Sequence, residues 1–133
     1  MNLSTRRKLV RMGIGILFIG AGLLHFTHAS LFEDLVPGAL KNYRGSINAL
    51  TGVLIFAMGV AFLVPWLRAV ARWSAITLLV VTLPTTVYRA IHPAAIESLG
   101  FTPALAVIGV LVWLLMIALI WWATRPEPND RNA

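Results

Sequence analysis

Charged side chains are spaced so widely that they divide the chain into four apolar segments. Three segments hold 21, 23 and 27 uncharged residues, and one holds only 16. In chain order the segments cover residues 12–32, 45–67, 73–88 and 98–124. A helix needs about 20 mainly apolar residues to cross a bilayer, so the short segment has to continue through Arg89. The pattern therefore predicts spanning helices at about 9–28, 45–65, 72–92 and 102–124.

The composition supports a membrane protein with a single domain. Of the 133 residues, 59% are hydrophobic and 12% are charged, whereas a soluble domain is about half apolar and a quarter charged. Four spans and their loops use nearly the whole chain. We expect an all-α integral membrane four-helix bundle over 1–133, with a disordered tail at 126–133. Cysteine is absent, which excludes disulfides, thiolate metal sites and dithiol redox chemistry.

Lys and Arg are distributed unevenly between the two ends of the predicted helices. Three lie beside one end, at Lys41, Arg44 and Arg89. Eight lie beside the other, at Arg6, Arg7, Lys8, Arg11, Arg68, Arg72, Arg125 and Arg131. Because basic residues collect on the cytoplasmic side of a membrane, this count predicts a bacterial inner-membrane protein with both termini in the cytoplasm. The same rule explains the net charge of +6 with the lipid bilayer as partner and without nucleic acid.

Short motifs predict how two of the helical segments begin. Ser30 and Glu33 have the spacing of a capping box, which predicts a short amphipathic helix on the membrane interface after the first span. Thr102 followed by Pro103 is typical of the N-cap and first residue of a helix, and predicts the start of the last span.

Small residues recur at helical spacing in the first two predicted spans. Gly45, Ala49, Gly52 and Gly59 form one stripe, and the pairs Gly13/Gly20 and Gly15/Gly22 are each seven residues apart. Small residues let two helix backbones approach closely in lipid. We therefore expect these stripes to be packing surfaces.

The candidate functional residues gather at the predicted outer end. His25, His28 and His92 all lie there, and Tyr88 and Arg89 are within one helical turn of His92. These five residues are the predicted ligand-binding set. No Asp or Glu lies within a predicted span, so a proton or ion pathway lacks its usual parts, and no catalytic residue is predicted.

This group of residues has four possible interpretations. It can be a metal site, a haem site, a ligand cavity, or a set of side chains that only lie at the membrane–water interface. The spacing matches no strong metal motif, and nothing distinguishes haem-ligating histidines from interfacial ones. We therefore expect neither metal nor haem. The remaining interpretation is a polar-rimmed cavity that binds a quinone-like or lipid ligand, with walls from Phe26, Phe32 and Phe101.

Several runs of this sequence resemble the DoxX-like family of small four-helix bacterial membrane proteins. They are the run from Gly20 through His25 to Thr27 with 32–37 after it, the segment from Gly52 to Pro65 with Arg68 and Arg72, and the stretch from Leu83 to Tyr88 with His92 after it. The likeness covers about residues 11–124. Ile55 and Thr86 stand where many members have a glutamate and an asparagine.

The resemblance implies the four-helix fold and an association with redox processes, since one DoxX-like protein is a quinone-linked thiosulfate oxidation subunit. We therefore expect an accessory component beside a membrane oxidoreductase, or a homo-oligomer, without independent catalytic activity. The alternative is a structural subunit or assembly factor of a larger membrane complex, with no ligand site.

Overall fold

The computed structural model describes residues 2–34, 36, 38–92 and 102–126, and every regular element in these parts is helical. The elements are α1 (Leu3–Thr27), α2 (Ala29–Glu33), the 3-10 helix η1 (Gly38–Tyr43), α3 (Arg44–Leu63), the 3-10 helix η2 (Pro65–Leu67), α4 (Arg68–Ile91) and α6 (Pro103–Ala123). Four helical stretches are long and apolar enough to cross a membrane. The predicted all-α, four-span architecture is confirmed to that extent. Most of the tail predicted to be disordered, 127–133, lies outside the described residues.

The first span begins six residues earlier than predicted, because the helix continues through its basic flank. Asn2 is the N-cap, and its side-chain oxygen accepts a hydrogen bond of 2.9 Å from the backbone amide of Thr5. Exposed Lys and Arg side chains are compatible with helix, so a charged flank does not end one. The third span likewise begins earlier, at Arg68, because η2 leads directly into it.

The predicted capping box is wrong. The helix α2 begins at Ala29, so Ser30 lies inside it, and the N-cap position belongs to His28 without a side-chain cap. The backbone amide of His28 still bonds to the carbonyl of Leu24, which leaves no linker in which Ser30 could act as a cap. At α6 the prediction is confirmed, since the Thr102 hydroxyl accepts from the amide of Leu105 and Pro103 follows it.

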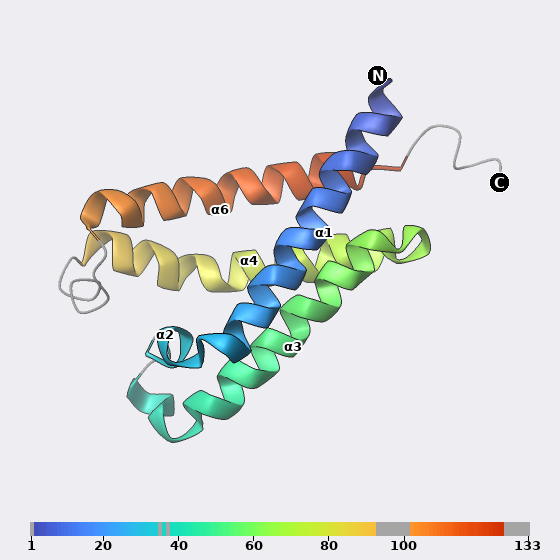
Figure 1. Ribbon diagram of the computed structural model, residues 1–133. Helices are drawn as coiled ribbons and strands as arrows, with labels where there is room; N and C mark the ends of the chain where they lie inside the picture. The colour runs from blue at the N-terminus through green and yellow to red at the C-terminus, as the bar shows by residue number, and fades with distance from the viewer. Residues whose placement is uncertain (1, 35, 37, 93–101, 127–133) are drawn as a thin grey trace.

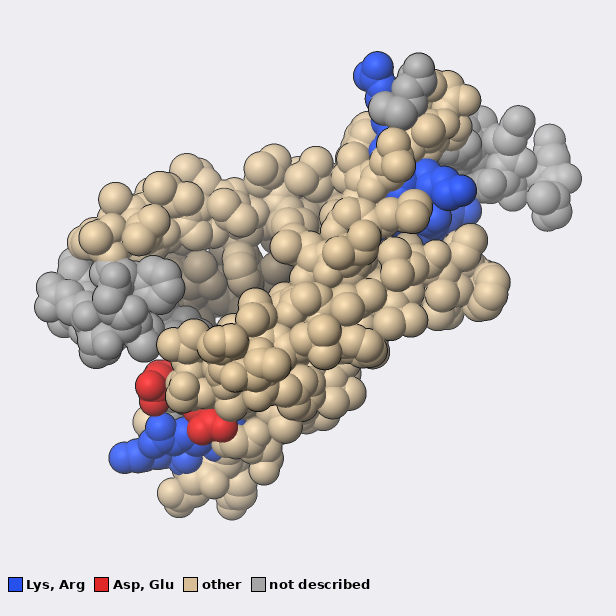
Figure 2. All heavy atoms as spheres, in the orientation of Figure 1, with Lys and Arg blue, Asp and Glu red and all other residues tan. Residues whose placement is uncertain are grey.

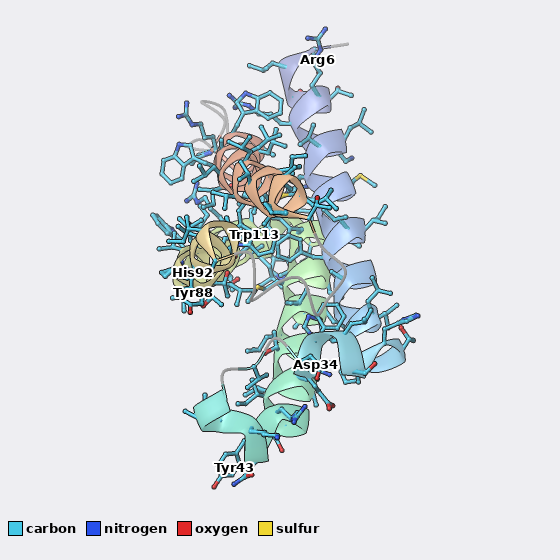
Figure 3. The ribbon with its side chains drawn as sticks, turned by 90° about the vertical axis from the view of Figure 1, so that its left-hand side faces the viewer. Arg6, Asp34, Tyr43, Tyr88, His92 and Trp113 are labelled. Carbon is cyan, nitrogen blue, oxygen red and sulfur yellow. The ribbon has the colours of Figure 1, made fainter. Side chains whose placement is uncertain are left out.

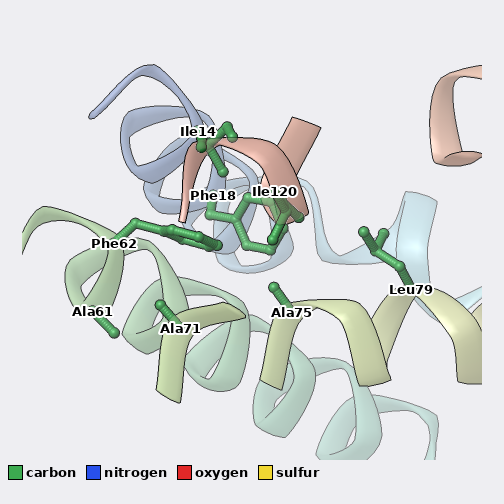
Figure 4. Close-up of a cluster of buried hydrophobic side chains, with 9 residues drawn as sticks. Ile14, Phe18, Ala61, Phe62, Ala71, Ala75, Leu79 and Ile120 are labelled. Carbon is green, nitrogen blue, oxygen red and sulfur yellow. The ribbon is translucent and has the colours of Figure 1, made fainter. Parts of the chain in front are cut away.

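The four long helices form two antiparallel pairs, α1 with α3 and α4 with α6 (Figure 1). The pairs cross near the end where α1 begins and α6 ends, and diverge toward the end that holds α2 (Figure 1). We call these the terminal end and the α2 end. The hydrophobic core contains Phe62 and Ile120, both fully buried, and Ala71 and Ala75 of α4 lie beneath them in Figure 4.

Glycines bring the α1 and α3 backbones into direct contact. A Cβ atom added at Gly22 would lie 2.7 Å from the backbone nitrogen of Phe56, and one at Gly59 would lie 2.6 Å from that of Ile19. Added Cβ atoms at Gly15 and Gly52 would also meet the facing helix. Gly13 and Gly20 do not contribute, because nothing lies within 4 Å of a Cβ added there, and one added at Gly45 would meet only the Glu33 carboxylate of α2, at 3.6 Å.

The two ends of the bundle differ in charge. Most of the described Lys and Arg residues lie at the terminal end, whereas Lys41 and Arg44 lie at the α2 end together with the described acidic residues, Glu33 and Asp34 (Figure 2). Asp34 there forms a salt bridge of 3.3 Å with Arg44. Figure 3 shows Arg6 and Tyr43 at opposite extremes of the molecule. The start of α1, the α3–α4 turn and the end of α6 therefore share one end, as the charge pattern predicted.

Candidate functional site

A cavity of about 360 Å³ lies between the two helix pairs, on the side where they diverge. Its lining comes from α1, α2, α3, α4 and α6, with Val36 and Leu40 from the connection between α2 and α3. In Figure 2 the surface is hollowed between the α4/α6 pair and the α1/α3 pair. The lining residues are His25, Phe32, Val36, Leu40, Ile47, Asn48, Thr51, Ile55, Leu78, Thr82, Thr85, Thr86 and Trp113.

His25 is the central polar group of the cavity, and Asn48 holds it in one orientation. The two side chains are 9% and 5% exposed, and His25 Nδ1 lies 2.6 Å from Asn48 Oδ1. Asn48 Nδ2 donates to the backbone carbonyl of His25 over 2.7 Å. Because that carbonyl can only accept, the second bond identifies which end of the amide is the oxygen. His25 Nδ1 therefore carries a hydrogen, and Nε2 of the neutral ring is left as an acceptor.

The short helix α2 closes one side of this arrangement. The Phe32 ring stacks on the His25 imidazole, with 3.8 Å between ring centroids and an interplanar angle of 23°. A histidine with an aromatic ring on one face and an amide on Nδ1 has little freedom to rotate. The direct succession of α1 and α2 thus positions the imidazole for the cavity.

Threonines supply the remaining polar lining. The hydroxyls of Thr51, Thr82 and Thr86 each donate to the carbonyl four residues earlier in their own helix. Trp113 Nε1 donates to Thr82 Oγ1 over 3.1 Å, which joins α6 to α4 at the cavity wall. Since a hydroxyl has only one hydrogen to donate, these oxygens can offer only their lone pairs to another molecule.

The cavity is therefore apolar with a small set of polar groups, most of which offer hydrogen-bond acceptors while the Thr85 hydroxyl can also donate. His25 Nε2, Thr51 Oγ1 and Thr86 Oγ1 can each accept a hydrogen bond, whereas the hydrogens of these groups are already engaged. No carboxylate is among the described residues that line it. A partly apolar molecule that carries hydroxyl hydrogens matches this pattern of walls and acceptors.

A family model for a domain of unknown function, DUF8561, matches residues 14–126. The chain belongs to the DUF8561 family. That match covers α1 from residue 14 onward, all of α3, α4 and α6, and every described residue of the cavity. No curated protein and no solved structure matches the chain. Nothing in the match links DUF8561 to the DoxX-like proteins, so that resemblance stays a hypothesis.

One of the five predicted ligand-binding residues of this DUF8561 chain lines the cavity, and three described ones do not. His25 is in place, but His28 is exposed and pairs with its neighbour Thr27. Tyr88 is 55% exposed, and His92 stacks on it with 4.1 Å between ring centroids. Figure 3 shows both at the end of α4, away from α1. The side chain of Arg89 lies outside the described part of the structure.

The aromatic residues predicted to form the cavity wall also differ in whether they line it. Phe32 lines the cavity, Phe26 is half-exposed, and Phe101 lies outside the described residues. Sequence reasoning missed Asn48 and Trp113. A usable signal existed for Asn48, because it is the amide within an otherwise apolar span, and a polar side chain at membrane depth needs a partner.

Proposed function

We propose that this DUF8561 protein binds a lipid-soluble molecule with a hydroxyl-bearing ring, of the quinol type, between its helices. The observation that carries this proposal is the buried His25–Asn48 pair at the wall of the cavity. A histidine fixed through Nδ1 presents Nε2 as an acceptor, and a quinol hydroxyl is the matching donor. A quinone has carbonyls only, for which the described lining offers fewer partners, namely the Thr85 hydroxyl and the second Nδ2 hydrogen of Asn48.

The place of the cavity supports a ligand that arrives through the membrane. The lining residues belong mainly to helices that are long and apolar enough to span a bilayer. Ile47, Ile55 and Leu78 provide apolar wall for a ring or an isoprenoid chain. Such a pocket, with few and well-placed polar groups, is the usual form of a small-molecule site.

The redox part of the proposal rests on the DoxX-like resemblance. Ile55 and Thr86, where many DoxX-like proteins carry a glutamate and an asparagine, both line the cavity. With an isoleucine and a threonine there, the cavity holds a ligand without offering it a carboxylate base. We therefore propose an accessory role, in which the protein binds the quinol and a partner membrane oxidoreductase carries out the electron transfer.

The charge distribution supports a location in the bacterial inner membrane with both termini in the cytoplasm. In that orientation the cavity opens toward the outer leaflet. A quinol bound there would be available to a partner that works at the outer face of the membrane.

Binding to purified protein in phosphatidylcholine nanodiscs tests the proposal directly. The probes are a short-chain benzoquinol, its oxidised quinone and its dimethyl ether, compared by calorimetric titration without oxygen. We expect the quinol to bind most tightly, because it alone donates two hydrogen bonds. His25→Ala and Asn48→Ala should each weaken quinol binding about two- to tenfold, as expected for one net hydrogen bond of about 0.5–1.5 kcal/mol.

His28→Ala is the matched control, since His28 caps the end of the same helix but lies outside the cavity. Equal affinity for the quinol and the dimethyl ether would contradict the proposal, as would identical binding by the His25 and His28 variants. If no probe binds and a stoichiometric membrane partner co-purifies, the alternative function as a structural subunit takes its place.

A further inference from the structure

A second cavity, of about 310 Å³, lies at the terminal end of the bundle. Its lining is strongly basic, with four arginines and one lysine and no carboxylate among the described lining residues. The residues are Ser4, Thr5, Arg7, Lys8, Arg11, Pro65, Arg68, Ala123 and Arg125. Like charges brought together in this way repel one another, so an anion bound among them would be stabilised.

Arg11 is the buried centre of this basic cavity. The residue is only 6% exposed, and its Nε atom is buried without a hydrogen-bond partner among the described residues. Arg7 Nε, on the same helix, is in the same condition. A buried N–H group that lacks an acceptor costs free energy, and a cationic one costs more. Both Nε atoms are enclosed by protein, so an anion in the cavity would meet the terminal nitrogens of the two guanidinium groups, and its negative charge would offset the cost of burying these cations.

Neighbouring groups hold the arginines in position. Arg7 Cζ lies 5.8 Å from the centre of the Trp122 ring, and Arg125 Cζ lies 5.9 Å from that of Trp121. Arg68 donates through Nε to the carbonyl of Pro65 over 3.3 Å. Stacking on indole favours guanidinium groups and restricts their motion. The cluster is thus a formed site rather than a set of freely moving side chains.

We infer that this cavity binds the phosphate group of an anionic phospholipid. Guanidinium groups match phosphate oxygens with paired, charge-assisted hydrogen bonds. The depth of the cavity favours a lipid as the source of the phosphate. It lies at the ends of spanning helices, beside Trp66, Trp121 and Trp122, and tryptophan is enriched at the level of the headgroups. Basic pockets between helices at this depth are suited to anionic headgroups.

The test measures binding to the full-length protein in a zwitterionic detergent. The probes are short-chain phosphatidylglycerol, short-chain phosphatidylcholine and inorganic phosphate, each titrated by calorimetry at low and high salt. We expect phosphatidylglycerol to bind at least tenfold more tightly than the other two, and its affinity to fall as salt rises. Arg11→Gln should weaken it about tenfold or more.

Two further variants keep the result interpretable. Arg6→Gln removes an exposed charge on the same helix that does not line the cavity, and should change binding less than twofold. Arg125→Gln removes an exposed lining residue, so its loss of affinity cannot come from misfolding. Equal losses in the Arg6 and Arg11 variants would overturn the inference, because they would show a diffuse charge effect.

The remaining outcomes also decide the matter. Binding of inorganic phosphate as tight as that of phosphatidylglycerol would overturn the lipid as the source. Absence of binding by every probe would overturn the site itself. Glu127 and Asp130 belong to the part of the chain outside the described residues, and an E127Q/D130N variant should bind like the wild type. A large gain of affinity in that variant would show that the tail carboxylates occupy the cavity instead.

Discussion

The two cavities of this bundle differ in how their polar groups are satisfied. At the α2 end, His25, Asn48, Thr82 and Trp113 form hydrogen bonds with one another and with the backbone. At the terminal end, Arg7 and Arg11 keep buried donors without partners in the described part of the chain. The polar groups of the first cavity are therefore neutral and hydrogen-bonded within the protein. Those of the second cavity are cationic, and two buried donors there lack partners among the described residues.

The difference corresponds to two depths of a bilayer. Charged side chains are costly in the hydrocarbon region, where neutral groups need internal hydrogen bonds. Near the headgroups, cations are stable and meet anionic oxygens. A cavity with spare acceptors fits a neutral ligand with hydroxyl hydrogens, whereas a cavity with spare cationic donors fits an anion. One small fold can therefore hold two cavities of opposite hydrogen-bond character. One offers acceptors, and the other offers cationic donors.

Cysteine labelling of the two ends should give the largest effect, because each position is either accessible from outside the membrane or not. The chain has no cysteine, so each single-cysteine variant reports one position. Ala39→Cys at the α2 end should react with an impermeant maleimide in intact spheroplasts. Ala69→Cys near the terminal end should react only after lysis, although both positions are exposed. The opposite labelling pattern would place the basic cavity outside and remove the proposed orientation.

Gly52→Val should damage the α2-end cavity more than the terminal-end one. A Cβ at Gly52 would lie 2.7 Å from the Cβ of His25, so α1 and α3 have to separate there. We expect a stability loss of about 1–3 kcal/mol and loss of quinol binding, measured by thermal unfolding and titration. Phosphatidylglycerol binding should survive. Gly20→Val is the control, since open space surrounds Gly20, and equal damage from both variants would refute the close-packing account.

Trp113→Phe should have the smallest effect. It removes the hydrogen bond from Trp113 to Thr82 and keeps a smaller aromatic ring at this position. The expected loss of stability is about 0.5–1.5 kcal/mol, seen in thermal unfolding. Thr82 Oγ1 gains a free lone pair, so quinol affinity should stay the same or rise. Trp66→Phe, at a residue that is 83% exposed, should change neither quantity. A fall in quinol affinity for the Trp113 variant would mean that its N–H contacts the ligand.

Hydropathy and charge predicted most of the fold, because crossing a bilayer imposes length and composition on each helix. The start of α1 was misplaced, since the capping amide of Asn2 lies beyond a run of cations that a helix tolerates. In α1 only two of the four predicted packing glycines contact the facing helix. Spacing places Gly15 and Gly22 on one face and Gly13 and Gly20 on another, and only the facing helix decides between them.

The site was less predictable, because it depends on how the helix pairs diverge. His25 and His92 both lie at helix ends and look equivalent in the sequence. The divergence of the pairs puts His25 in the cavity and leaves His92 exposed beside Tyr88. Asn48 was missed because an isolated amide is a weak signal on its own. Its role requires the backbone carbonyl of His25, 23 residues earlier, to lie next to it.

Two hydrogen bonds between α4 and α6 determine how these helices align along their length. The helix α6 is apolar on all sides and little of it is buried apart from Ile120 and Ala123, so few packed side chains fix its position along α4. Arg72 donates to the Thr124 carbonyl over 3.4 Å, and Trp113 donates to Thr82. The anchor points lie at 72 and 82 on α4, and at 124 and 113 on α6. The separations of the anchor points on the two helices are nearly equal, about 15 Å at 1.5 Å per residue. The two hydrogen bonds together therefore fix the position of α6 along α4.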